Sequence, residues 1–220
     1  RGPSAGCGRP KIVDALEAIW ARRSIGRLRE PAPSAGELGL LLEAAAAAPD
    51  HGELRPWRFV VLQGTAKERF GEVLADALEA RCRARGVAPT EGQLAKERTK
   101  LGRAPLVLVV AAVRRPTGVI PWEEQVAAGA AAAENALIAA TALGYGSMWR
   151  TGEVVSDDRV KAALGLLADD AIIGFLYLGT ATPDVAKPPR RPDLAGLVEH
   201  WAPPSGCGEG VPRGGDELQL

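Results

Sequence analysis

Apolar and polar positions repeat with helical spacing in some segments of the chain and form short apolar runs in others. The helical spacing predicts amphipathic helices over residues 12–23, 38–48, 65–78, 122–143 and 156–164. Runs rich in β-branched residues predict strands over residues 57–62, 106–113 and 171–179, with a shorter strand inside 145–152. Because residues 106–113 are apolar without interruption, both faces of that strand should be covered, which places it at the centre of a sheet.

Polar residues of the kind that cap helices mark several of the expected boundaries. Residues 34–37 and 65–68 each match the capping-box pattern, and Thr90 is interpreted as a third helix start. Gly144 supplies a C-terminal stop for the long alanine-rich helix. The charged segment 91–103 is interpreted as a mostly solvated helix rather than as a mobile lid.

The stretch 49–59 places an imidazole and several guanidinium groups between a helix and a strand. Pro49 ends the helix, and Pro56 is expected to hold Arg55 in extended geometry. A loop that carries His51 and Arg55 suits an anionic or planar heteroaromatic ligand. The alternative, an ordinary connection with solvated arginines, stays open at this point.

Two further segments carry candidate binding groups. Arg22, Arg23 and Ser24 follow the first helix, where two guanidiniums and a hydroxyl can close around a phosphate. Alternatively, the two arginines only cap the last carbonyls of the helix. Residues 145–152 have glycines at both sides, so the backbone there can approach a ligand closely. A buried Trp-Arg pair, such as the one in this segment, also occurs as plain packing.

Composition and charge narrow the classes of function. The chain has 220 residues, 46% of them hydrophobic, which suffices for one domain with a sizeable core. Lys plus Arg and Asp plus Glu each number 27, so no net charge attracts nucleic acid or a membrane surface. Three cysteines without metal-ligand spacing, and a first segment without an apolar signal core, predict a cytoplasmic protein.

The domain is expected to span residues 11–201, between low-complexity ends at 1–10 and 202–220. The most apolar long segment, residues 126–144, is mostly alanine and contains Glu134 and Asn135, so it predicts a buried or dimer-facing helix rather than a membrane span. A proline-rich arm beyond Pro183 is expected to lie across the domain or across a second subunit.

Four motifs in this order resemble the nitroreductase family of FMN enzymes. They are Arg-Arg-Ser at 22–24, Ala-Pro-Asp-His at 48–51 with Arg-Pro-Trp-Arg-Phe at 55–59, Gly-Tyr-Gly-Ser-Met-Trp-Arg-Thr-Gly at 144–152, and Ile-Gly-Phe-Leu-Tyr-Leu-Gly-Thr at 173–180. The resemblance covers about residues 11–201 and is strongest to the small, single-domain bacterial NAD(P)H nitroreductases. It implies an α+β fold with a mixed, mainly antiparallel sheet flanked by helices, and an intertwined homodimer with two FMN sites at the subunit interface.

The resemblance also assigns roles to individual residues. The phosphate and ribityl chain of FMN would be held by Arg22, Arg23 and Ser24, and the partner subunit would contribute its own His51 and Arg55. The isoalloxazine ring would lie along Trp149, Arg150 and Thr151. Contacts to NAD(P)H would come from the helix end formed by Ala139, Ala140, Thr141, Ala142, Leu143 and Gly144. Many relatives carry Ser, Asn or Gln in place of His51 and Arg55, and the tail after Pro203 has no counterpart in the family.

The activity implied is ping-pong hydride transfer from NAD(P)H through flavin N5 to an electron-poor small molecule, such as a nitroaromatic or a quinone. No catalytic triad, metal-ligand cluster or paired catalytic carboxylate is visible in the sequence, which agrees with chemistry carried by a cofactor. Three alternatives stay open. The flavin enzyme could dehalogenate its substrate or cleave FMN itself, the protein could bind flavin without turnover, or it could be a purely structural alanine-rich dimer.

Overall fold

The computed structural model describes residues 14–182 and 191–201. Its centre is a four-stranded sheet in which each strand runs antiparallel to its neighbours, in the order β1-β2-β4-β3. The strands are β1 (Trp57–Gln63), β2 (Leu106–Ala112), β3 (Gly146–Arg150) and β4 (Ala171–Gly179). The predicted α+β class with a mainly antiparallel sheet is therefore confirmed.

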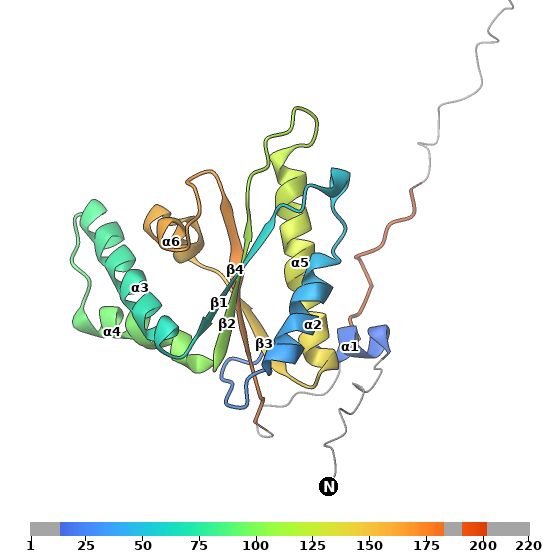
Figure 1. The fold of residues 1–220 in the computed structure, drawn as a ribbon, viewed down its shortest axis with the longest axis horizontal. Helices are drawn as coiled ribbons and strands as arrows, with labels where there is room; N and C mark the ends of the chain where they lie inside the picture. The colour runs from blue at the N-terminus through green and yellow to red at the C-terminus, as the bar shows by residue number, and fades with distance from the viewer. Residues whose placement is uncertain (1–13, 183–190, 202–220) are drawn as a thin grey trace, which may run out of the picture. The chain divides into compact units, whose positions relative to one another are not determined.

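Helices cover both faces of this sheet (Figure 1). One face carries α3 (Thr65–Ala84), α4 (Glu91–Thr99) and α6 (Asp158–Ala163). The other carries α5 (Trp122–Ala142) and α2 (Ala35–Ala46), and α1 (Ala15–Ala21) packs against α5. Three short 3-10 helices complete the description, namely η1 (His51–Glu53), η2 (Lys100–Arg103) and η3 (Glu153–Ser156).

The strand β2 is buried along its whole length, as its unbroken apolar sequence predicted. Side chains alternate along a strand, so Val107 and Val109 join the core below α3, while Leu106 and Leu108 join the core below α5. The sheet therefore separates two apolar clusters, and each helical layer has its own core.

Helix boundaries follow local capping chemistry, with two differences from the sequence prediction. The capping box at Ser34 is formed as predicted, and the predicted helix start at Thr90 is confirmed, with a capping box of its own. The box predicted at Thr65 is wrong, because Gly64 occupies the N-cap position with φ +50° and no side chain caps the helix. The short helix α6 is capped by Asp157 instead of Ser156.

The segment 91–103 forms the mostly solvated helix that its charge pattern favoured, since no residue of α4 is buried. It folds as α4 and η2, and Leu101 within it is only 1% exposed. The helix packs on α3 at Gly71, where an added Cβ would lie 2.1 Å from the carbonyl oxygen of Arg98. A close backbone approach of this kind requires glycine, and it draws the segment against the domain.

Residues 191–201 form a separate small unit with one turn at residues 195–197. The role of the arm beyond Pro183 stays a prediction, and the ends predicted at residues 1–10 and 202–220 lie outside the described residues. Within the described residues, no helix combines the length and the apolar character needed to cross a membrane. Over the same residues, no cluster of three or more His, Cys, Asp or Glu side chains is arranged to hold a metal ion.

Candidate functional site

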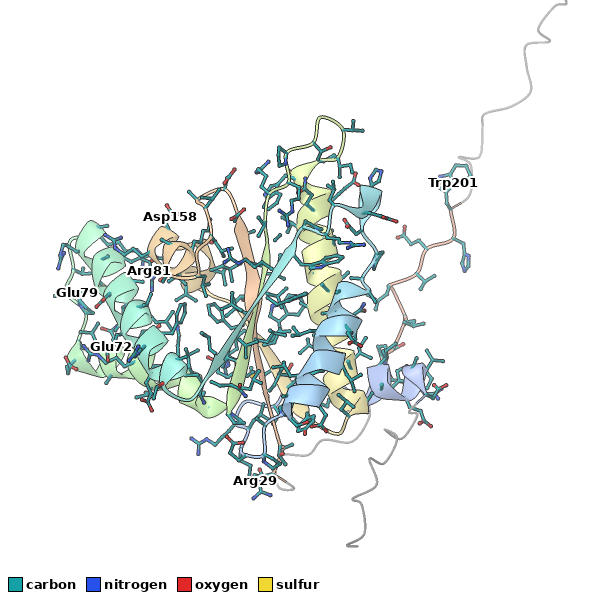
Figure 2. The ribbon with its side chains drawn as sticks, in the orientation of Figure 1. Arg29, Glu72, Glu79, Arg81, Asp158 and Trp201 are labelled. Atoms are coloured by element: carbon teal, nitrogen blue, oxygen red, sulfur yellow. The ribbon has the colours of Figure 1, made fainter. Side chains whose placement is uncertain are left out.

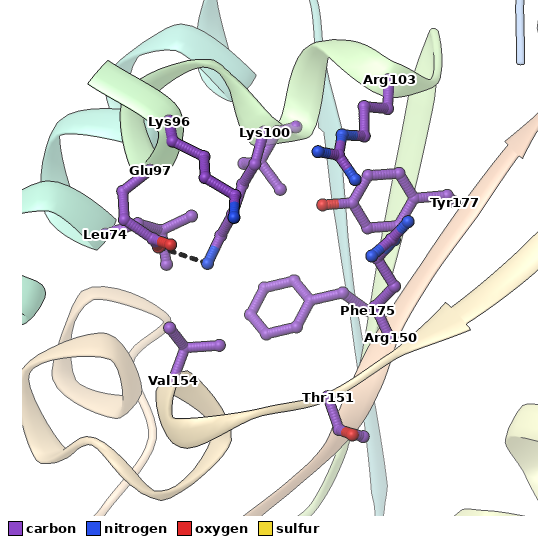
Figure 3. A pocket seen from close by; sticks show the side chains of 11 residues that line it. Leu74, Lys96, Glu97, Lys100, Arg103, Arg150, Thr151, Val154, Phe175 and Tyr177 are labelled. Carbon is purple, nitrogen blue, oxygen red and sulfur yellow. Dashed lines mark hydrogen bonds and ion pairs between the residues drawn. The ribbon is translucent and has the colours of Figure 1, made fainter. Parts of the chain in front are cut away.

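A cavity of about 190 Å³ lies on the face of the sheet that α3 and α4 cover, at the end of β3 (Figure 3). Its apolar side chains come from α3, η2, η3 and β4, and its charged side chains come from α4, η2 and β3. The residues that line it are Leu74, Lys96, Glu97, Lys100, Leu101, Arg103, Arg150, Thr151, Val154, Phe175 and Tyr177.

The cavity is strongly cationic. Lys96, Lys100 and Arg103 follow one another at spacings of four and three residues, so one side of α4 and η2 presents all three. With Arg150, four cationic side chains share the cavity with a single carboxylate, Glu97, which already pairs with Lys100. Such a surplus of positive charge in a partly enclosed space favours an anionic ligand.

Arg150 combines close packing with a buried donor atom that the described part of the protein leaves unsatisfied. Its Nε atom is buried and has no hydrogen-bond partner among the described residues. Its guanidinium carbon lies 5.6 Å from the centroid of the Tyr177 ring. On the other side, a Cβ at Gly26 would be 3.9 Å from its terminal nitrogen. The side chain is thus held in place by packing, while part of its hydrogen-bonding capacity is unused.

Tyr177 forms part of the floor of this cavity, beside Arg103 and Arg150 (Figure 3). Burial raises the pKa of its phenol to about 12, although the two neighbouring cations act in the opposite direction. The phenol therefore stays protonated at neutral pH, and it remains available as a hydrogen-bond donor.

The predicted motif Arg22, Arg23 and Ser24 lies alongside β3. Ser24 forms a parallel bridge with Ser147, and the backbone amide of Ile25 donates to the Ser147 carbonyl at 2.9 Å. The structure therefore brings the first motif next to the strand that carries Trp149 and Arg150.

The two arginines of that motif also have structural partners. Arg22 Nε lies 3.2 Å from a carboxylate oxygen of Glu134 on α5. Arg23 donates to the carbonyls of Trp20 and Arg22, at 2.7 Å each, which is the helix-capping role considered as an alternative. Their contact with a phosphate stays a prediction.

Trp149 and Arg150 point to opposite faces of the sheet, since they are consecutive residues of a strand. The indole of Trp149 packs in the core below α5 and donates to the carbonyl of Ile173 at 3.1 Å. Gly174 leaves the room for it, because a Cβ there would lie 2.1 Å from the indole nitrogen. Of the predicted ring-binding residues, only Arg150 and Thr151 line the cavity.

The loop that carries His51 and Arg55 lies beside a different part of α5 from the part that Arg22 contacts. His51 Nδ1 is 2.7 Å from Glu124 near the start of that helix, whereas Arg22 pairs with Glu134 ten residues further on. At about 1.5 Å per residue, the two carboxylates are about 15 Å apart along the helix. A single chain therefore does not bring His51 and Arg22 together, and their convergence across two subunits stays a prediction.

The extended geometry predicted for Arg55 is wrong. Arg55 has φ +47°, and its backbone N–H donates to the carboxylate of Asp50. The restriction before proline acts mainly against the right-handed helical region, so it leaves the residue free to adopt this turn when a side chain holds it.

The segment predicted to contact NAD(P)H forms the end of α5 and the turn after it. Ala140 is fully buried, and the hydroxyl of Thr141 donates to the carbonyl of Leu137 at 3.0 Å. Gly144 adopts φ +85°, the left-handed geometry of a helix stop. These contacts show that the residues of the segment serve to end the helix. Contact of the segment with a nicotinamide cofactor stays a prediction.

Sequence reasoning missed Lys96, Lys100 and Arg103 as candidate binding residues. Their spacing on one helical face was the available signal, but a solvated helix shows the same spacing. What separates the two cases is the packing of α4 on α3 through Gly71, which joins parts of the chain far apart in sequence.

Comparison with known proteins agrees with this architecture. The model of the Nitroreductase family matches residues 19–180. The chain belongs to the nitroreductase family. A relative in Escherichia coli (strain K12), named "Putative NAD(P)H nitroreductase YdjA", is 36% identical over 190 residues, which are 86% of this chain and 100% of the relative.

Solved structures of this family share the fold. The nitroreductase-like family protein from Bacillus cereus has a TM-score of 0.71 at 21% identity, over 88% of this chain and 99% of its own. A crystal structure from Desulfovibrio desulfuricans, described as "a putative nitroreductase in complex with fmn", has a TM-score of 0.63 at 26% identity, over 88% of this chain and 100% of its own.

Proposed function

We propose that this nitroreductase-family protein is an FMN-dependent oxidoreductase that works as a homodimer. It takes hydride from NAD(P)H and passes it to an electron-poor small molecule, such as a nitroaromatic or a quinone. The family membership supports the reaction class, and the FMN bound to the Desulfovibrio desulfuricans neighbour supports the cofactor.

The observation that carries the proposal is the cationic cavity at the end of β3. Its four cations face one paired carboxylate, and the buried Nε of Arg150 lacks a partner within the described residues. These features fit FMN, which has a phosphate at one end and an electron-rich ring edge at the other. Ligand sites typically measure about 300–1,000 Å³, so this cavity can hold one part of the cofactor, and a second subunit would complete the site.

FMN, when bound, supplies the chemistry by accepting and releasing hydride at its N5 atom. The protein would supply binding and electrostatics. Arg150, Lys96 and Lys100 would place positive charge beside the flavin, which stabilises a reduced, anionic ring and raises its reduction potential. Arg22, Arg23 and Ser24 would hold the phosphate end, and the partner subunit's His51 and Arg55 would close the site from the other side.

The experiment that tests the proposal begins with the absorbance spectrum and the mass in solution of the purified protein, with and without added FMN. NADH or NADPH is then added anaerobically, followed by a nitroaromatic or a quinone. A yellow dimer that NAD(P)H bleaches and that the acceptor restores is the expected result.

Each alternative predicts a different outcome of the same experiment. A halogenated phenol that restores the spectrum faster than a nitroaromatic would favour a dehalogenase, and loss of FMN during turnover would favour cleavage of the flavin. Bound FMN that NAD(P)H does not bleach would indicate a flavin-binding dimer without turnover. Protein that is colourless after incubation with excess FMN and removal of the free flavin would overturn the proposal in favour of a structural dimer.

A further inference from the structure

We propose that Arg81 and Arg85 on α3 are positioning residues that fix the segment 151–157 and, with it, one wall of the cationic cavity. Their partners are Glu153 at the start of η3 and Asp157 just after its end. The effect on ligand binding rests on the proposed function, because FMN is the ligand used to measure it.

The ion pairs between α3 and this segment differ in burial. Arg81 lies 2.5 Å from Asp157, and their side chains are only 17% and 5% exposed. Arg81 Nε also lies 3.5 Å from Glu153, and Arg85 lies 2.5 Å from the other oxygen of the same carboxylate. A nearly buried pair is thus extended by a solvent-exposed one, and the four side chains form a single network.

The segment that this network holds lies beyond the paired part of β3. Pairing of β3 with β4 ends at Arg150, and the two following residues are exposed. The hydrogen bonds of the next turn are local, such as the one from the Val155 amide to the Gly152 carbonyl at 3.1 Å. The packing of Val154 and Val155 on the core and the ion pairs connect the segment to the rest of the domain.

The opposite wall of the cavity is fixed to the same helix. Leu74 of α3 lines the cavity, and α4 is held against α3 at Gly71 and by the ion pair between Arg98 and Glu72 at 3.0 Å. Glu72, Glu79 and Arg81 lie along α3 (Figure 2). Because Arg81 follows Leu74 by two helical turns, one rigid helix carries the contacts of both walls, and the network sets the distance between them.

The exposed pair is the better place for a test. Removing one member of the nearly buried Arg81–Asp157 pair would leave an uncompensated charge and could unfold the domain. Arg85 and Glu153 have side chains that are 60% and 55% exposed, so they tolerate substitution. Arg83 provides a matched control, since it is on the same helix but pairs with Glu79 of that helix.

The experiment compares R85E, E153R, the double swap R85E/E153R and the control R83E in the full chain. FMN dissociation constants are measured by titration of flavin fluorescence, and amide hydrogen exchange is followed in residues 151–157. Each single variant should weaken FMN binding by about twofold to fivefold, the range that exposed ion pairs give, and should speed exchange in this segment. The double swap re-forms the contact between positions 85 and 153 but places a like charge beside Arg81, so it should restore both properties only in part. R83E should change neither.

Equal FMN affinity and equal exchange in R85E and R83E would overturn the proposal. Faster exchange in R85E without any change in FMN affinity would also overturn it, since the segment would then not shape the binding site. If the unaltered protein binds no FMN, the proposed function fails first, and the exchange data alone then decide whether the network holds the segment.

Discussion

Replacing Arg150 with Met should affect ligand binding and ligand-free stability in opposite directions. The side chain contributes a guanidinium to the cavity, where its buried Nε has no hydrogen-bond partner within residues 14–182 and 191–201. Charge-assisted hydrogen bonds are worth about 1.5–3 kcal/mol each, so loss of one to FMN should weaken binding about 10-fold to 150-fold.

The same substitution removes a buried, unsatisfied hydrogen-bond donor from the ligand-free protein. A buried polar group without a partner costs about 1–3 kcal/mol, and methionine retains most of the apolar stem. The contact of Arg150 with the Tyr177 ring, worth about 0.5–1 kcal/mol at such sites, is lost at the same time. The net change should lie between zero and a gain of about 2 kcal/mol, and each kcal/mol shifts the melting temperature by about 2–4 °C.

The assay pairs FMN titration with thermal unfolding of protein freed of flavin. Arg69→Met is the control, because Arg69 is exposed on α3 and is not among the residues that line the cavity. If R150M melts at a clearly lower temperature than the unaltered protein while its FMN affinity is unchanged, Arg150 is a structural residue and the assignment of the cavity is wrong.

Three further predictions concern other parts of the molecule. Arg22→Ala should cost about 1.5–3 kcal/mol of FMN affinity, whereas the control Glu134→Gln, which removes only the ion pair of Arg22, should leave the affinity unchanged. An unchanged FMN dissociation constant in R22A would exclude Arg22 from the site. Gly71→Ala should cost about 1–3 kcal/mol in denaturant unfolding, because the methyl would lie 2.1 Å from the Arg98 carbonyl, and a neutral result would contradict that approach. The hydrogen bond from Arg85 lowers the pKa of the Glu153 carboxyl below its ordinary value of 4.5. The unaltered protein should therefore be more stable than E153Q by a full, constant amount above pH 4.5, and this difference should vanish as the pH falls through the lowered pKa. A difference that does not vary with pH would count against this ion pair.

The sheet could be predicted from sequence because its signals are local. An unbroken apolar run such as residues 106–113 has few alternatives to a strand covered on both faces, and β2 is buried as expected. The first residue of a helix is harder to predict. Gly64 and Thr65 are adjacent, and the capping-box pattern at Thr65 gave no reason to prefer the glycine, which the turn after β1 places at φ +50°.

The cavity could be predicted only in part because it depends on contacts distant in sequence. Arg150 and Thr151 were recognised through a motif, whereas Lys96 and Lys100 are on a helix whose charge pattern also fits full exposure to solvent. Their position follows from one glycine of α3 that admits the backbone of α4. The alternation of side chains in β3 then decides that Arg150 faces these lysines and Trp149 does not.

The positions of Arg22 and His51 place a condition on the proposed dimer. Their carboxylate partners, Glu134 and Glu124, are ten residues apart on α5, or about 15 Å along its axis. If Arg22 of one protomer and the partner's His51 contact the same part of one FMN, two copies of α5 that run antiparallel across the two-fold axis would bring the level of residue 134 to the level of residue 124. The axis must then pass α5 midway between these levels, near Gly129.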